Sequence, residues 1–275
     1  MCNGSIMDKL ISFALPLMLS GILQLMFNAV DIVVVGHFTG KQALAAVGST
    51  TALINVFTNL FIGISLGANV LAARFFASGR EKEMSDTVHT AILLALISGI
   101  LMAGIGVISA KGALLLMGTP DNVIAQSTLY MRIYFLGMPA LAVYNFGNAV
   151  FSAAGDTKRP LKYLSMAGVV NIILNLFFVI VCKMDVAGVA VSSIISQYLS
   201  AAMISVALFR SGDIYGLHRS ELRLNRNKTV NIIRIGIPAG LQNAIFQIAN
   251  LFVQAGVNSF DATMVAGNAA AANAD

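Results

Sequence analysis

Asp31 is the residue of this sequence whose position most needs an explanation, because it interrupts the apolar run LQLMFNAVDIVVVG at residues 23–36. A charged side chain near the centre of a bilayer costs at least about 2.5–3.5 kcal/mol on insertion scales, so such residues face a bundle interior or a wet cavity. The alternative is an acid close enough to the outer membrane surface to be hydrated. The favoured interpretation is a carboxylate that binds and releases a proton or a cation.

Helical spacing gives Asp31 polar neighbours on its own segment. Gln24 and Asn28 lie seven and three residues before it, so the three side chains share one face of a helix. Later apolar stretches contain Asn171 and Asn175, and then Ser192, Ser193, Ser196 and Gln197. Such stripes either hold helices together through hydrogen bonds or line a binding site. An acid on a facing helix favours the binding site.

Other site chemistries have little support in the sequence. The histidines His37, His89 and His218 are scattered over predicted loops and helix ends, so neither a metal cluster nor a pair of nucleophile and base is predicted. A Walker-type G-x-x-x-x-G-K-[ST] sequence is absent, which excludes an ATP-driven motor of that kind. We therefore expect no enzyme and no cofactor, and the one metal ion considered is Na⁺ at Asp31.

The elements that must position these residues are membrane-spanning helices. The 275 residues are 57% hydrophobic and 11% charged, with a mean hydropathy of +0.83, whereas soluble domains carry roughly 25% charged residues. Spans of the required length, about 20 residues, are predicted at Leu10–Val35, Leu44–Ala73, Thr87–Ile108, Leu129–Ala154, Leu161–Cys182, Val186–Leu208 and Val230–Val257. The first segment is too long for a signal peptide, so we expect it to be retained.

Prolines and glycines mark places where the spans bend or approach one another. Pro16, Pro139 and Pro238 lie inside predicted spans, where each removes a backbone hydrogen bond. They act as static kinks or, in a protein that changes conformation, as hinges. Gly63 and Gly67 form a G-x-x-x-G on the second span, which indicates close helix packing.

Basic residues are concentrated in alternate loops. The loops after the second, fourth and sixth spans hold most of the 17 lysines and arginines, among them Arg80, Lys158 and Arg226. Because cytoplasmic loops carry the basic excess, the amino terminus is predicted to be inside. This placement explains the net charge of +5 without a nucleic-acid partner. We expect the protein in the cytoplasmic membrane.

The sequence contains an internal similarity between two spans. Residues 12–38 align with residues 234–260, with Pro16 on Pro238. An even number of crossings separates the two segments, so the repeat is parallel, as in transporters whose halves are related by an axis along the membrane normal. The prediction is an all-α polytopic membrane protein with a six-helix transmembrane lobe at 1–228 and the start of a second, parallel-repeat lobe at 229–275, in a chain that is a fragment.

Segments along the whole chain resemble the multidrug and toxic compound extrusion (MATE) family of transporters. They are ALPLMLSGILQLMFNAVDIVVVGHFTGKQALAAVG, FSAAGDTKRPLKY, NIILNLFFVI followed by GVAVSSIISQ, and IGIPAGLQNAIF. The resemblance implies two six-helix lobes around a central cavity that opens alternately to either side. It also implies export of small organic cations in exchange for H⁺ or Na⁺.

The resemblance also implies roles for particular residues. The family's cation site falls here on Asp31, Asn171, Asn175 and Ser193. Asn175 stands where many relatives have aspartate, which weakens a sodium site and favours proton coupling. The residues expected to line the substrate cavity are Gln24, Asn28, Tyr144, Asn148 and Gln197, and the candidate hinges are Pro16, Pro139 and Pro238.

Two other interpretations remain at this point. A flippase of lipid-linked oligosaccharides, from the same superfamily, needs Arg and Lys in its cavity to meet pyrophosphate, and the spans contain almost none. A seven-helix receptor matches the number of spans, but it would have an outside amino terminus. We therefore expect an antiporter that contacts membrane lipid and functions as a monomer.

Overall fold

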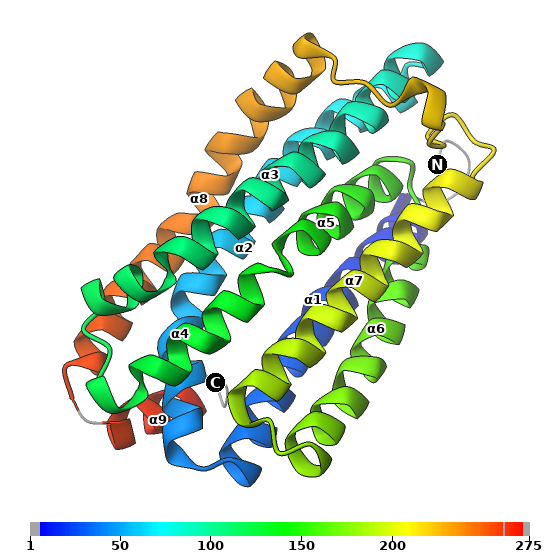
Figure 1. The fold of residues 1–275 in the computed structure, drawn as a ribbon. Helices are drawn as coiled ribbons and strands as arrows, with labels where there is room; N and C mark the ends of the chain where they lie inside the picture. Colours follow the sequence, from blue (N-terminus) through cyan, green and yellow to red (C-terminus); the bar gives the residue numbers. More distant parts are fainter. Residues whose placement is uncertain (1–5, 261, 272–275) are drawn as a thin grey trace.

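The protein is a bundle of long helices. The structure, a computed structural model, describes residues 6–260 and 262–271, and no strand occurs within these residues. The helices run roughly along one common axis (Figure 1). In chain order the elements are α1 (Ile6–Phe38), α2 (Lys41–Ala77), α3 (Glu81–Leu116), α4 (Asp121–Phe135), α5 (Met138–Ala153), α6 (Lys158–Leu176), the π-helix η1 (Phe177–Val181), α7 (Asp185–Arg210), the 3₁₀-helix η2 (Arg219–Glu221), α8 (Arg226–Asn258) and α9 (Ala262–Ala271).

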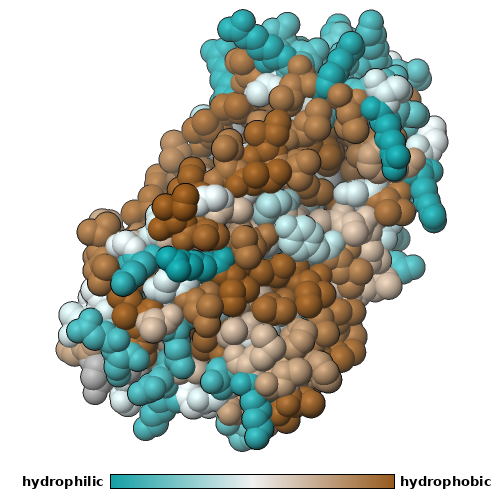
Figure 2. Space-filling model, in the orientation of Figure 1, coloured by the Kyte–Doolittle hydropathy of each residue, from teal (hydrophilic) through white to brown (hydrophobic). Residues whose placement is uncertain are grey.

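Six of the described helices are long and apolar enough to cross a membrane: α1, α2, α3, α6 with its extension η1, α7 and α8. Large apolar side chains on their outer faces are open to the surroundings, as at Ile108 and Phe252, which are 83% and 74% exposed. Figure 2 shows the same pattern on one face, where a hydrophobic middle lies between two hydrophilic ends. Because an apolar surface of this extent is unfavourable in water, the chain is a multi-pass membrane protein.

The fourth predicted span differs most from the structure. A single helix at Leu129–Ala154 is wrong, because α4 ends at Phe135 and a turn separates it from α5. Pro139 consequently lies in the first turn of α5, where its missing N–H removes no helical hydrogen bond. At the break, the carbonyl of Leu136 accepts a hydrogen bond of 3.0 Å from the hydroxyl of Tyr198 on α7. A neighbouring helix thus helps to hold the break.

Helices α2 and α8 approach closely at two pairs of glycines. Gly63 and Gly67 of α2 lie against Gly240 and Gly236 of α8. A methyl group added at Gly236 would lie 2.7 Å from the backbone of Ile64, which is closer than side chains approach in folded proteins. The close packing predicted from the G-x-x-x-G of α2 is confirmed, and its partner is a second G-x-x-x-G on α8.

The two halves of α1 have different surroundings. Ile32 and Val35, after the middle of the helix, belong to a buried apolar cluster with side chains of α2, α4 and α7. Leu10 and Met18, before the middle, are 60% and 64% exposed. Asp31 lies at the start of the buried part, so packing of its neighbours fixes the direction in which its side chain points.

Candidate functional site

Asp31 is the centre of a buried polar network between α1, α6 and α7. Its side chain is 8% exposed. The amide nitrogen of Asn175 donates a hydrogen bond to Oδ1 of Asp31, and the hydroxyl of Ser193 donates to Oδ2 over 3.2 Å. Each carboxylate oxygen therefore has a donor from the protein.

The network continues beyond the carboxylate through neutral groups. The amide nitrogen of Asn175 also donates to Oδ1 of Asn171 over 3.2 Å, and the amide nitrogen of Asn171 donates to the Ser193 hydroxyl over 3.4 Å. The hydroxyl of Ser192 donates to Oδ1 of Asn175. These side chains are all buried. Buried dipoles of this kind strengthen one another in a low dielectric, and they leave the charge of Asp31 available to a proton or a cation.

Local helix geometry explains why these side chains meet. Asn171 and Asn175 are one turn apart on α6, so they lie on the same face. Ser192 and Ser193 are adjacent on α7 and reach two different partners, the first Asn175 and the second Asp31. Shortly after Asn175 the helix widens into the π-helix η1, a feature that is frequent at functional sites.

Asp31 opens onto a cavity of about 160 Å³ between the helices. The described residues that line the cavity are Gln24, Phe27, Asp31, Thr51, Ile54, Asn55, Thr58, Tyr130, Tyr134, Leu141, Tyr144, Asn145, Leu164, Ala167, Gly168, Asn171, Ser193, Ser196, Gln197 and Ser200. Asp31 is the one charged residue among them, and the list contains neither lysine nor arginine. The wall therefore contains one acidic group, many side chains that form hydrogen bonds, and several aromatic rings.

The structure brings most of the predicted site residues together. Gln24, Tyr144 and Gln197 line the cavity, whereas Asn148 does not and accepts a hydrogen bond of 3.4 Å from Ser152. The side chain of Asn28 lies outside the described residues. Pro16 and Pro238 lie inside α1 and α8, as predicted.

Sequence reasoning missed several residues of the cavity. Asn145, three residues before Asn148, is the asparagine of α5 that lines the cavity, and spacing alone did not distinguish the two. Tyr130 and Tyr134 are one turn apart on α4, and their rings stack with centroids 6.1 Å apart. Their i, i+4 spacing was the signal that could have predicted a tyrosine face toward Asp31.

Two residues that line the cavity each have a buried oxygen without a hydrogen-bond partner in the described structure. These atoms are the hydroxyl oxygen of Thr58 on α2 and the side-chain carbonyl oxygen of Gln197 on α7. A buried acceptor without a donor costs about 1–3 kcal/mol.

The expectation that the histidines are scattered is wrong for two of them. The rings of His89 and His218 lie with centroids 6.3 Å apart, although 128 positions of sequence lie between them. One potential metal-ligand atom from each of these histidines and one from Glu221 lie within 4.8 Å of one another. This cluster is separate from the cavity, because none of the three residues lines it.

The model of the MatE family matches residues 16–177, which is more than half of the chain. The chain belongs to the MatE family. It is 27% identical over 271 residues to the probable multidrug resistance protein YpnP of Bacillus subtilis, covering 96% of this chain and 59% of that protein. It is 24% identical over 264 residues to a FAD transporter of Shewanella oneidensis, and this match covers 94% of this chain and 58% of that protein.

A solved structure supports the same fold. The inward-facing conformation of a multidrug resistance MATE family transporter of the MOP superfamily matches with a TM-score of 0.83 and 21% sequence identity. The match covers 94% of this chain and 60% of that one. The chain therefore spans somewhat more than half the length of these MatE relatives, and its fold is the all-helical fold of MATE transporters.

Proposed function

We propose that this chain forms one lobe of a secondary antiporter that exports organic cations in exchange for protons. The observation that carries the proposal is a single buried carboxylate in a cavity whose described wall contains no basic residue. A cation that enters such a cavity meets an uncompensated negative charge. Membership of a transporter family supports transport over catalysis, so we propose no enzymatic role.

The shape of the wall supports a cargo with both a cationic and a hydrogen-bonding part. Asp31 attracts the charge, and the rings of Tyr130 and Tyr134, which line the cavity, are aromatic groups of the kind that attract cations. The side chains of Asn55, Asn145 and Ser200, which line the cavity, add hydrogen-bonding groups. An amine or guanidine attached to an aromatic ring fits these requirements.

The coupling ion that we propose is the proton. The amide nitrogen of Asn175 points at Asp31 and at Asn171, and so presents hydrogens where a metal ion would need oxygen ligands. Protonation of Asp31 neutralises the charge and releases a cationic cargo. Loss of the proton restores the charge, so proton and cargo compete for one carboxylate. A sodium ion at Asp31 is the alternative to exclude by experiment.

Anionic cargoes are the second class of candidate. Lipid-linked oligosaccharides, the cargo of a flippase, and FAD both carry phosphate groups, which proteins bind chiefly through arginine and lysine. The described cavity wall offers one carboxylate and no lysine or arginine, which disfavours both. We also propose a monomer in the cytoplasmic membrane with its amino terminus inside, on the basis of the alternating basic loops, and Pro16 and Pro238 as hinges.

The test uses the protein expressed from its native gene in proteoliposomes with a fluorescent organic cation. A pH gradient and a sodium gradient are applied in turn to the wild type, to Asp31→Asn and to Asp121→Asn, a matched change at the exposed start of α4. We expect uptake driven by the pH gradient in the wild type and in Asp121→Asn, and none in Asp31→Asn. Uptake that survives in Asp31→Asn, or transport of FAD or a lipid-linked sugar in place of the cation, would contradict the proposal.

A further inference from the structure

A second pocket lies at the end of the bundle at which α2 ends and α3 and α8 begin (Figure 1). It has a volume of about 510 Å³, which is within the range of about 300–1,000 Å³ that is usual for small-molecule sites. Side chains from the end of α2 and from the starts of α3 and α8 line it. It shares no lining residue with the cavity that contains Asp31, so the two sites are separate.

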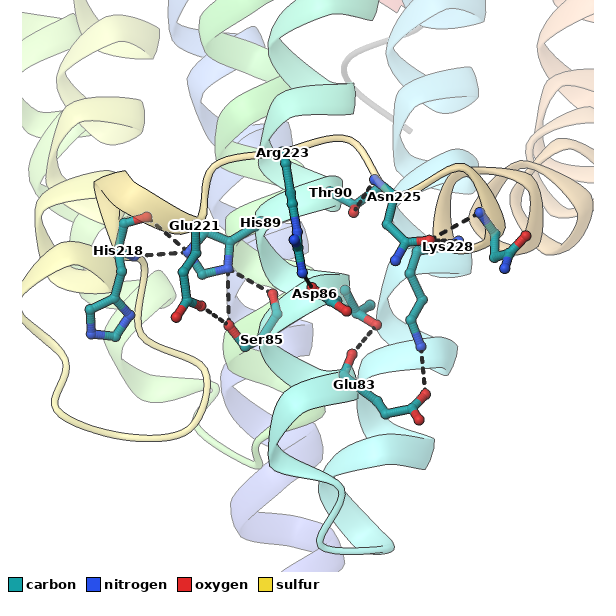
Figure 3. A network of polar contacts seen from close by, with 12 residues as sticks. Glu83, Ser85, Asp86, His89, Thr90, His218, Glu221, Arg223, Asn225 and Lys228 are labelled. Carbon is teal, nitrogen blue, oxygen red and sulfur yellow. Dashed lines mark hydrogen bonds and ion pairs between the residues drawn. The ribbon is translucent and has the colours of Figure 1, made fainter.

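The two acidic side chains of this pocket already have partners within the protein. Figure 3 shows both pairs. Lys228 Nζ lies 2.8 Å from Glu83 Oε2, and a guanidinium nitrogen of Arg223 lies 3.2 Å from Asp86 Oδ1. The ammonium of Lys228 also lies 3.7 Å from the centre of the Phe75 ring. Each negative charge of the pocket therefore has a positive neighbour.

Three further basic side chains line the pocket without such a partner. Arg74 belongs to the last turn of α2, Arg80 directly precedes α3, and Lys82 belongs to the first turn of α3. Within residues 6–260 and 262–271, no ion pair joins any of the three to a carboxylate. Like charges that converge on one pocket repel one another, so a bound anion would stabilise this arrangement.

The chemistry of the pocket fits a phosphate group. Arginine and lysine recognise phosphate because their N–H groups form charge-assisted hydrogen bonds with its oxygens. Asn231 of α8 adds a neutral amide to the wall. The backbone N–H groups of Asn227 and Lys228 are already capped by the side chain of Asn225. The positive side chains, and not the start of α8, are therefore the groups that would hold the anion.

Apolar side chains continue from the pocket along the outer surface of the bundle. Leu66 and Val70 precede Arg74 by two turns and one turn on α2, so the three residues share a helix face. Leu66 is 46% exposed and Val70 is 45% exposed. On α8, Val230 is exposed as well. A basic pocket next to an exposed apolar stripe favours a phospholipid over a soluble phosphate compound, because such pockets between membrane helices bind lipid head groups.

We propose that this pocket binds the phosphate group of an anionic phospholipid, with Arg74, Arg80 and Lys82 as its partners and the acyl chains along Leu66 and Val70. The bound lipid then connects the end of α2 to the start of α3 beside α8. The proposed orientation of the chain identifies the inner leaflet as the source of the lipid. The site itself does not depend on the proposed transport function.

The test is the melting temperature of the protein expressed from its native gene, in detergent micelles that contain phosphatidylglycerol or phosphatidylcholine with the same acyl chains. Both lipids contain a phosphate, but only phosphatidylglycerol has a net negative charge. In the wild type we expect phosphatidylglycerol to raise the melting temperature by at least about 2 °C relative to phosphatidylcholine. Inorganic phosphate, compared with chloride at the same ionic strength, should give no such rise.

Two variants assign the effect to the pocket. The pocket variant changes the three basic partners together: Arg74→Gln, Arg80→Gln and Lys82→Gln. The control variant removes the same number of charges from exposed positions that do not line the pocket: Lys158→Gln, Arg210→Gln and Arg219→Gln. We expect the difference between the two lipids to disappear in the pocket variant and to remain in the control variant.

Three outcomes would overturn the proposal. A difference between the lipids that survives in the pocket variant, or one that is lost equally in the control variant, assigns the effect to the general positive charge of the protein. A rise with inorganic phosphate as large as the rise with phosphatidylglycerol makes a soluble phosphate compound the ligand. Should the pocket variant fail to fold, Arg74→Gln, Arg80→Gln and Lys82→Gln are measured singly, and a full rise in all three contradicts the site. None of these measurements uses transport, so failure of the antiport proposal is recognised separately.

Discussion

Two polar networks connect distant parts of the chain, and they are built from different groups. The interior network around Asp31 contains one charged side chain, and its partners are the neutral Asn175 and Ser193. The network at the end of the bundle contains ion pairs, including Arg223 with Asp86 and Lys228 with Glu83. The interior network is buried, whereas in the second one some charged side chains, such as Arg223 and Glu83, reach water.

The difference follows from the cost of burying charge. Deep in a membrane protein an unpaired charge is expensive, so a chain that keeps one there gains something other than stability. Ion pairs near water contribute about 0–1 kcal/mol each and cost little to make or lose. The proposed function uses the interior network to bind and release a charged cargo, whereas the ion pairs at the end of the bundle hold the α7–α8 connection on α3.

The largest expected effect is the loss of transport in Asp31→Asn. In this variant a bound cation has no negatively charged partner. Removing one member of a buried charge pair costs about 2–5 kcal/mol, so cation uptake should fall at least about 30-fold. The amide fills the same volume without the cost of burying a charge, so the melting temperature should stay equal or rise. These quantities are measured in proteoliposomes and by thermal unfolding in detergent. Loss of uptake together with a large drop in melting temperature would make Asp31 a structural residue instead.

The next expected effect is a new sodium dependence in Asn175→Asp. A second carboxylate beside Asp31 replaces an N–H donor by oxygen ligands, which favour a hard cation. We expect saturating Na⁺, compared with K⁺ at the same ionic strength, to raise the melting temperature of this variant by about 2–4 °C. The wild type should show no such difference. A wild type that is stabilised by Na⁺ would refute proton coupling.

The sequence alone predicted the interior network better than the one at the end of the bundle. Asp31, Asn171 and Asn175 stand out because polar residues are rare in apolar spans and because helical spacing assigns them to faces. The break before α5 was not predictable, since an apolar run looks the same whether or not a turn interrupts it. His89 and His218 are far apart in sequence, and the path of a loop depends on tertiary contacts that no local pattern encodes.

A smaller effect is expected from Lys228→Met in the network at the end of the bundle. The Lys228 side chain is 10% exposed, and its ammonium lies 3.7 Å from the centre of the Phe75 ring. Methionine keeps the apolar stem but removes the charge, and with it both the cation–π contact and the ion pair with Glu83, so we expect a loss of about 1 kcal/mol in the free energy of unfolding. Denaturant unfolding measures it. An unchanged free energy of unfolding would mean that Lys228 contributes as little to stability as a fully exposed charge does.

The smallest effect is expected from Arg223→Gln, which removes an exposed charge from the same network as Lys228. The Arg223 side chain is 67% exposed, so water replaces its contact with Asp86 when the arginine is lost. We expect a change below about 0.5 kcal/mol, and one that vanishes at high salt because exposed pairs are screened. A loss larger than about 1 kcal/mol would mean that exposure does not set the strength of this ion pair, and the contrast between the two networks would then have to rest on the number of charges in each rather than on their burial.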